Sequence, residues 1–306
     1  MSAGRFEPPL QRRLHVGPDA APLSTIAALW QGPGDPQMRV TGHSVIRAMR
    51  LSGGPATISF DLAGSDVNVR AWGPGADEAL DAAPGLIGLH DDPTQLVAHH
   101  RLVADLVRRL PGLRLTRGGP VLESLVPSIL GQKVTGLEAR RGHRELLSRH
   151  GEPAPGPFGL RLPPPPELLA RMPYWAFHPL GVERRRADAI RAAAAVAHAL
   201  EQIRDLAPDE GRRRLQAVPG IGPWTAAETM RLALGDPDAI SVGDFHLPRL
   251  VGWALAGERD ADDARMLELL EPYRGQRARV VLLIEHGGIR VERHGPRLSA
   301  RSIATI

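Results

Sequence analysis

The hydrophobic periodicity of the chain changes once, near residue 95, and this change constrains the fold more than any other feature of the sequence. Before it, apolar and polar residues alternate over 38–51 and 56–72, which predicts half-buried antiparallel strands. A short helix interrupted at Pro84 is expected over 77–89. After residue 95, apolar residues recur at helical spacing. The sequence therefore predicts an α+β protein, with a small N-terminal antiparallel sheet followed by an all-helical domain.

The predicted domains follow from this change. Residues 1–95 are expected to form a mixed α/β sheet domain, 96–290 a helical domain, and 291–306 a basic C-terminal tail. The proline-rich segment 151–166 predicts an extended surface loop inside the helical domain. Further helices are predicted at about 185–201, 209–218, 223–234, 247–255, 261–270 and 276–285.

Composition excludes several classes of function. The chain contains no cysteine, which excludes a disulfide framework, a thiolate nucleophile and a cysteine-ligated zinc or iron-sulfur site. Its histidines lack metal-ligand spacing, so no metal site is expected. No apolar run approaches the ~18 residues of a membrane span, and the N-terminus has no secretory pattern, so we expect a cytoplasmic protein that does not bind membranes. The basic residues are almost all arginine, and Lys133 is the single lysine.

The most informative segment lies between residues 215 and 247. Gly220 and Gly222 can adopt positive φ in a tight connection between two helices, which leaves Ile221 free to point inward. Pro223 suits the first turn of the second helix. Exposed amides at such a helix start bind an anion, and a DNA phosphate bound in this way is recognised regardless of base sequence. An ordinary connection between antiparallel helices would use the same residues, so spacing alone leaves both interpretations open.

The string Val-Pro-Gly-Ile-Gly-Pro-Trp-Thr-Ala, residues 218–226, resembles the helix-hairpin-helix DNA glycosylase superfamily. Its hairpin reads Leu-Pro-Gly-(Ile/Val)-Gly-x-x-Thr-Ala, and an essential aspartate follows some twenty residues later, where this chain has Asp244. Residues 122–139 and 179–194 are similar to two further segments of the superfamily, so the resemblance covers roughly 96–290. Within the superfamily, the chain most resembles the alkylated-base, 3-methyladenine DNA glycosylase II type. Two features indicate this type: the N-terminal sheet, and the absence of the cysteines that bind an iron-sulfur cluster in other members.

The resemblance implies a bacterial base-excision-repair enzyme that binds double-stranded DNA, flips out a damaged, alkylated purine and excises it by hydrolysis. Asp244 would be the catalytic residue, because a carboxylate beneath the deoxyribose stabilises the cation that forms as the base departs. The alternative for Asp244 is a helix N-cap. Bifunctional members carry a Schiff-base lysine where this chain has Trp224, so no abasic-site lyase activity is expected.

The remaining candidate residues fall into two groups. The base pocket is predicted to contain Trp224, Glu228 and Trp175, with core packing or a solvated helix face as the alternative for each. Lys133 stands where alkylated-base relatives carry an apolar wedge that fills the gap left by the flipped nucleotide. The residues predicted to contact DNA are Gly220, Ile221, Gly222, Thr225, Gln132 and Lys133.

No cofactor is expected, although a monovalent cation held by the hairpin carbonyls would fit the family. A monomer is expected, because one cleft suffices for one duplex. Two other functions remain open: a non-catalytic helix-hairpin-helix DNA-binding protein, and a glycosylase for oxidised or deaminated bases. The latter would need an acid to protonate a neutral leaving base, and the sequence identifies no residue for this task. Segment 272–287 resembles the part of the family that supplies a further pocket aromatic, and its apolar run begins with valine and leucine here.

Overall fold

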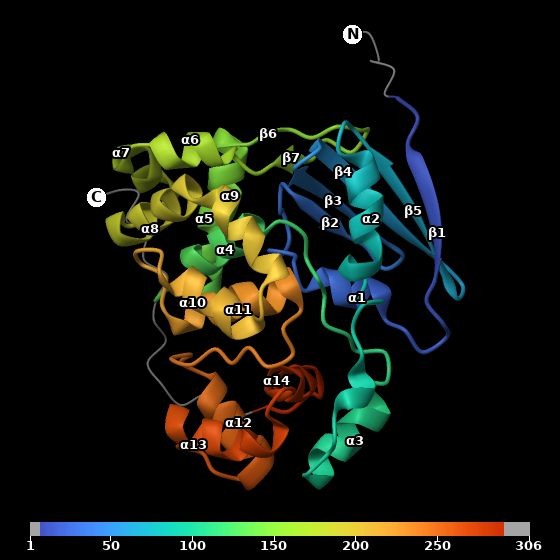
Figure 1. Ribbon diagram of the computed structural model, residues 1–306, viewed down its shortest axis with the longest axis vertical. Helices are drawn as coiled ribbons and strands as arrows, with labels where there is room; N and C mark the ends of the chain where they lie inside the picture. Colours follow the sequence, from blue (N-terminus) through green and yellow to red (C-terminus); the bar gives the residue numbers. More distant parts are fainter. Residues whose placement is uncertain (1–6, 291–306) are drawn as a thin grey trace.

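The computed structural model describes residues 7–290, and the predicted tail at 291–306 lies outside this range. The described chain begins with a five-stranded antiparallel sheet of order β1-β5-β4-β3-β2, followed mainly by helices (Figure 1). This confirms the predicted α+β class. The strands are β1 (Leu10–His15), β2 (Met38–Val40), β3 (Ser44–Leu51), β4 (Gly54–Ala63) and β5 (Asp66–Trp72).

Each of the two alternating segments predicted from the sequence contains a strand, a turn and a second strand. Residues 41–43 separate β2 from β3, and Gly64 turns the chain from β4 into β5 with a φ of +65°. Helix α2 (Ala76–Leu86) packs on one face of the sheet and continues through Pro84, so the predicted interruption at Pro84 is wrong. Proline cannot donate to the carbonyl of Leu80 four residues earlier, and Arg12 of β1 donates to that oxygen instead, at 3.3 Å.

The proline-rich segment is more closely packed than an ordinary surface loop. It contains two short strands, β6 (Glu152–Pro153) and β7 (Arg161–Leu162), and its Leu160 and Leu162 are buried against Ile46 of β3. Phe158 packs edge-on against Trp72 of β5, with ring centroids 5.0 Å apart. The segment therefore covers the sheet face opposite α2, which explains why β3 is buried along most of its length.

The helices form two groups, each around its own apolar core. The upper group in Figure 1 surrounds α4, and α11 and α8 pack directly on it. The lower group combines α3 with the three last helices around a second core. The helices outside the sheet unit are α3 (Arg101–Arg109), α4 (Val121–Leu130), α5 (Gly136–His150), α6 (Pro166–Arg171), α7 (Tyr174–Phe177), α8 (Arg184–Ala195), α9 (Ala197–Glu201), α10 (Pro208–Gln216), α11 (Pro223–Leu234), α12 (Leu247–Ala256), α13 (Asp263–Leu270) and α14 (Arg277–His286). A short helix α1 (Pro22–Ala27) lies against β3.

Buried polar contacts join these units. Glu123 of α4 accepts hydrogen bonds from the guanidinium of Arg47 on β3, at 3.0 Å, and from the backbone N–H of Arg50, at 2.7 Å. In the lower group, Arg279 of α14 forms a bidentate, buried ion pair with Asp91, which follows α2. These two contacts fix the sheet unit against α4 and α14.

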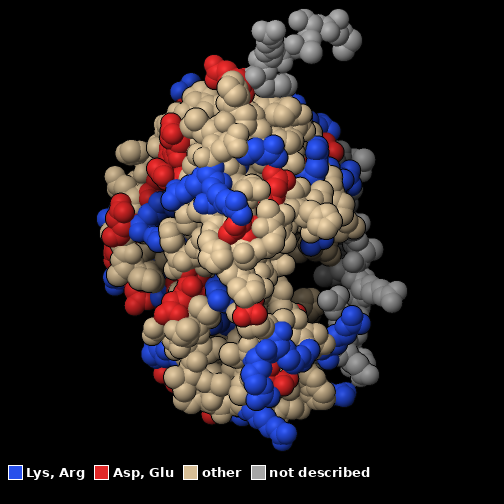
Figure 2. All heavy atoms as spheres, turned by 90° about the vertical axis from the view of Figure 1, so that its right-hand side faces the viewer, with Lys and Arg blue, Asp and Glu red and all other residues tan. Residues whose placement is uncertain are grey.

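Figure 2 shows one face of the molecule, on which basic side chains form separate groups in the upper and lower halves of the view, with acidic side chains between them. The distribution of charged side chains therefore does not identify a binding surface on this face. Within residues 7–290, no helix combines the length and apolar composition needed to cross a membrane.

Candidate active site

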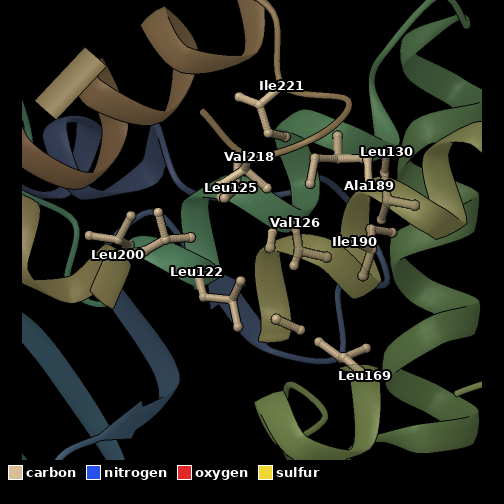
Figure 3. Packing of buried hydrophobic residues seen from close by; sticks show 14 of the residues in the cluster. Leu122, Leu125, Val126, Leu130, Leu169, Ala189, Ile190, Leu200, Val218 and Ile221 are labelled. Atoms are coloured by element: carbon tan, nitrogen blue, oxygen red, sulfur yellow. The ribbon is translucent and has the colours of Figure 1, made fainter. Parts of the chain in front are cut away.

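The hairpin between α10 and α11 is anchored by its central apolar residue. Ile221 is 5% exposed and, with Val218, enters the core around α4 (Figure 3). Burying such a side chain stabilises the fold by about 1.5–3 kcal/mol. Gly220 has a φ of +88°, and a Cβ there would lie 2.7 Å from the Cβ of Ala189. Gly222 keeps an extended backbone with a φ of −94°, so only Gly220 needs the left-handed region.

The start of α11 presents unpaired amides. The first N–H of this helix to bond backward is that of Ala226, which donates to the carbonyl of Gly222 at 3.0 Å. The amides of Gly222, Trp224 and Thr225 have no hydrogen-bond partner among residues 7–290. Pro223 at the first helical position has no N–H to satisfy. The hairpin thus offers donors for an anion at the positive end of a helix.

Gln132 ties the loop after α4 to this hairpin. Its side-chain amide donates to the carbonyl of Gly220 at 3.0 Å and to the hydroxyl of Thr225 at 2.8 Å. The next residue, Lys133, is exposed and has a φ of +55°, a value that costs a non-glycine residue about 1–2 kcal/mol. Thr135 and Glu138 then form a capping box that starts α5. The loop is therefore held at both ends while Lys133 stands out from it.

Asp244 is half-buried in the connection between α11 and α12 and uses both carboxylate oxygens. Oδ1 accepts the backbone N–H groups of His246 and Leu247, at 2.8 and 2.9 Å. Oδ2 accepts the indole N–H of Trp224, at 3.0 Å. Leu247 is the first residue of α12, so Asp244 satisfies amides at the helix start, as a capping residue does, although His246 occupies the N-cap position. The capping and chemical interpretations of Asp244 are therefore compatible.

Trp224 has a different position from the one expected of a pocket wall. Its ring lies against the end of α4, since a Cβ on Gly131 would be 3.3 Å from its Cη2. Its indole N–H is directed at Asp244, and the ring is not among the groups that line the recess described next. The contact indicates that Trp224 orients the carboxylate.

Asp244 lines a recess with a volume of about 90 Å³ between the two helical cores. One wall comes from α11, which packs on the upper core, and another from α12 and α14 of the lower core. Residues 239–246, which connect α11 to α12, complete the lining. The polar residues of the lining are Glu228, Arg231, Ser241, Asp244, His246 and Glu285. The recess is therefore polar and contains three carboxyl groups beside one guanidinium.

Glu228, predicted for the base pocket, lines this recess one helical turn after Trp224. One of its oxygens accepts the hydroxyl of Ser241, and the other accepts Arg231 at 2.7 Å. Burial on its own would lower the pKa of Arg231, but the charge of Glu228 and its hydrogen bond raise it instead. Both oxygens of Glu228 are thus occupied by fixed partners.

Glu285 on α14 is a member of the recess that the sequence analysis missed. The residue is exposed at the edge of the recess; its pKa is raised, because desolvation on the side that faces the recess disfavours the carboxylate and the attraction of Arg231 only partly offsets this. The only sequence feature that could have indicated Glu285 as a site residue is its position directly after the apolar run Val280–Ile284. It occupies the segment in which the resemblance predicts a pocket aromatic.

The structure does not bring Trp175 to this recess. Trp175 lies on α7, is 74% exposed and is absent from the lining. Its prediction rested on the aromatic cluster at 174–177, of which Tyr174 and Phe177 pack within the upper helical group. Phe245, next to Asp244, is 75% exposed and packs against His246 with ring centroids 4.9 Å apart.

No protein-family model matches the chain. A curated protein of Mycobacterium tuberculosis, named "Probable bifunctional transcriptional activator/DNA repair enzyme AlkA", is 30% identical over 167 residues. The match covers 53% of this chain and 34% of the other, so the chain spans about a third of the length of the relative it matches.

Solved structures resemble the whole architecture. A 3-methyladenine DNA glycosylase from Archaeoglobus fulgidus has a TM-score of 0.72 at 20% identity, covering 89% of this chain and 96% of that one. An 8-oxoguanine glycosylase/lyase from Clostridium acetobutylicum, in complex with double-stranded DNA containing cytosine opposite 8-oxoguanine, has a TM-score of 0.71 at 14% identity. That match covers 93% of this chain and 99% of the other. The fold is thus shared by enzymes named for different damaged bases.

Proposed function

On the premise that this chain has the fold of the helix-hairpin-helix DNA glycosylases, we propose that it is a hydrolytic DNA glycosylase that releases damaged purines from duplex DNA. The observation that carries the proposal is Asp244, a carboxylate fixed by three hydrogen bonds at a polar recess and joined through Trp224 to the hairpin helix. The names of the similar proteins support the same class of reaction.

The hairpin would hold the DNA backbone. The free amides of Gly222, Trp224 and Thr225 can bind a phosphate at the start of α11, independently of base sequence. Gln132 fixes the neighbouring loop, from which Lys133 can meet a second phosphate or enter the stack with its aliphatic stem. Binding of this kind depends on salt, since it releases counterions.

The flipped nucleotide would place its base at the recess and its sugar over Asp244. As the bond between C1′ and the base breaks, positive charge develops on the deoxyribose, and the carboxylate stabilises it. Water then adds to C1′ and leaves an abasic site. The reaction needs no cofactor, because water is the nucleophile and the protein supplies the charge.

We propose that the preferred substrates are alkylated purines and that the enzyme has no lyase activity. A cationic base leaves readily and is attracted by the carboxylates of Asp244 and Glu228, whose combined charge exceeds that of the single guanidinium of Arg231. The Schiff-base lysine of bifunctional relatives is replaced by Trp224, and the single lysine of the chain lies in the loop after α4.

The test is base release from randomly methylated duplex DNA, with the freed bases identified by mass. Asp244→Asn should reduce release by about 10²-fold or more while DNA binding is retained. Asp260→Asn, at an exposed residue after α12, is the matched control and should keep wild-type activity. If the wild-type protein binds DNA and releases no methylated base, the alkylated-base proposal is wrong, and a different lesion or a non-catalytic DNA-binding protein remains.

A further inference from the structure

Glu285 differs from the other carboxyl groups of the recess in having no fixed partner. Asp244 accepts three hydrogen bonds, and Glu228 is held by Ser241 and Arg231. The side chain of Glu285 has no hydrogen bond or ion pair within the described part of the chain. It lies on the recess lining and close enough to Asp244 to interact with it electrostatically. A base that enters the recess would therefore meet one carboxyl group that is free to bond to it.

We propose that Glu285 is a further catalytic residue, which donates a proton to the departing base; this inference rests on the glycosylase function proposed above. The bond between C1′ and the base nitrogen breaks, and its electron pair goes to the base. The carboxyl O–H of Glu285 gives its proton to a ring nitrogen of the base and becomes a carboxylate. Water adds to C1′, and the proton that it loses restores the acid. The products are a neutral base and an abasic sugar.

Glu285 is exposed at the edge of the recess, and its pKa is nevertheless raised by its surroundings. Desolvation raises its pKa, and the negative charges of Glu228 and Asp244 raise it further, whereas Arg231 and His286 lower it. His246 also lines the recess, and Arg109 of α3 is directed at the carbonyl of Gly287, at 3.4 Å, next to the end of α14. A carboxylic acid with a pKa moved toward neutrality is suited to general acid catalysis.

Proton donation divides the substrates into two classes. A cationic base such as 7-methylguanine leaves as a neutral molecule and needs no added proton. A neutral base such as hypoxanthine leaves as an anion unless it is protonated, so only its release should depend on Glu285. Because the acid must be protonated, release of the neutral base should fall as pH rises through the pKa of Glu285.

The experiment compares two duplexes of identical sequence, one with a single hypoxanthine and one with a single 7-methylguanine. Single-turnover release is measured from pH 5 to pH 9 for the wild-type protein, Glu285→Gln and the control Glu167→Gln, which makes the same change at an exposed residue of α6 outside the recess. We expect Glu285→Gln to slow hypoxanthine release by about 10²- to 10⁴-fold, to abolish its decline at high pH, and to leave 7-methylguanine release nearly unchanged. Glu167→Gln should keep the wild-type rate and the decline.

Several results would overturn the proposal. One is an equal loss on both substrates. Another is a decline at high pH that survives in Glu285→Gln or disappears in Glu167→Gln. A third is release of 7-methylguanine with no release of hypoxanthine by the wild-type protein. If the glutamine variant does not fold, Glu285→Asp keeps a carboxyl group and should keep the decline. Release of neither base by the wild-type protein would instead overturn the glycosylase function itself.

Discussion

Replacing Trp224 by phenylalanine separates two roles that an aromatic residue can have at this site. The change removes the indole N–H that donates to Asp244 Oδ2 at 3.0 Å and keeps a ring against Gly131. A hydrogen bond to a charged group contributes about 1.5–3 kcal/mol. Asp244 keeps its two backbone donors, so the carboxylate remains near its place but is less well oriented. If most of the lost energy is needed in the transition state, base release slows roughly 10- to 100-fold.

The assay is single-turnover base release at saturating enzyme, with DNA affinity and the free energy of unfolding measured in parallel. We expect the rate to fall while DNA affinity stays within a few-fold, since the change removes no backbone amide of the hairpin. Trp253→Phe on α12 is the matched control, because its ring packs against Arg259 and not against Asp244. An unchanged rate in Trp224→Phe, combined with a large loss in Trp224→Ala, would refute the orienting role and favour stacking on the base.

Two further predictions concern stability and DNA binding. Asp91→Asn leaves the buried guanidinium of Arg279 without its counter-ion and should lower the free energy of unfolding in urea by about 3–5 kcal/mol. A decrease of less than about 1 kcal/mol would contradict a structural role for this ion pair. Lys133→Gly removes the strain of a left-handed backbone at a non-glycine residue and should stabilise the fold by about 1 kcal/mol. The same change should lower the slope of log DNA affinity against log salt concentration by roughly one. An unchanged slope would show that Lys133 contacts no phosphate.

The helical part of the fold could be predicted closely from the sequence, because long periodic segments bounded by proline and glycine define their own ends. The helix predicted at 223–234 corresponds to α11 without any shift, and that predicted at 276–285 corresponds to α14 within one residue. The sheet was harder to predict. A turn as short as that at Gly64 interrupts the alternation too briefly to separate two strands, and β1 is mostly exposed, so its pattern carries little signal.

The parts of the candidate site that the sequence predicted lie in two segments with recognisable motifs, 122–139 and 215–247, and Gln132 joins them in the structure. The hairpin and Asp244 fall within one continuous segment, and the structure joins them through Trp224. Glu285 lies some forty residues beyond Asp244, and only the packing of α14 brings it to the recess. Trp175 shows the opposite error, because an aromatic cluster in the sequence does not reveal which way its exposed member faces.

Because the walls of the recess come from two separately packed cores, its selectivity for bases can change during evolution without a change in the residues that line it. Its width depends on how α11 sits relative to α12 and α14, and therefore on large and small side chains deep inside each core. A substitution such as a leucine replaced by a methionine far from any lining residue can widen or narrow the opening by shifting one helix against another. The range of accepted bases can therefore drift through interior repacking while every group that touches the base remains the same.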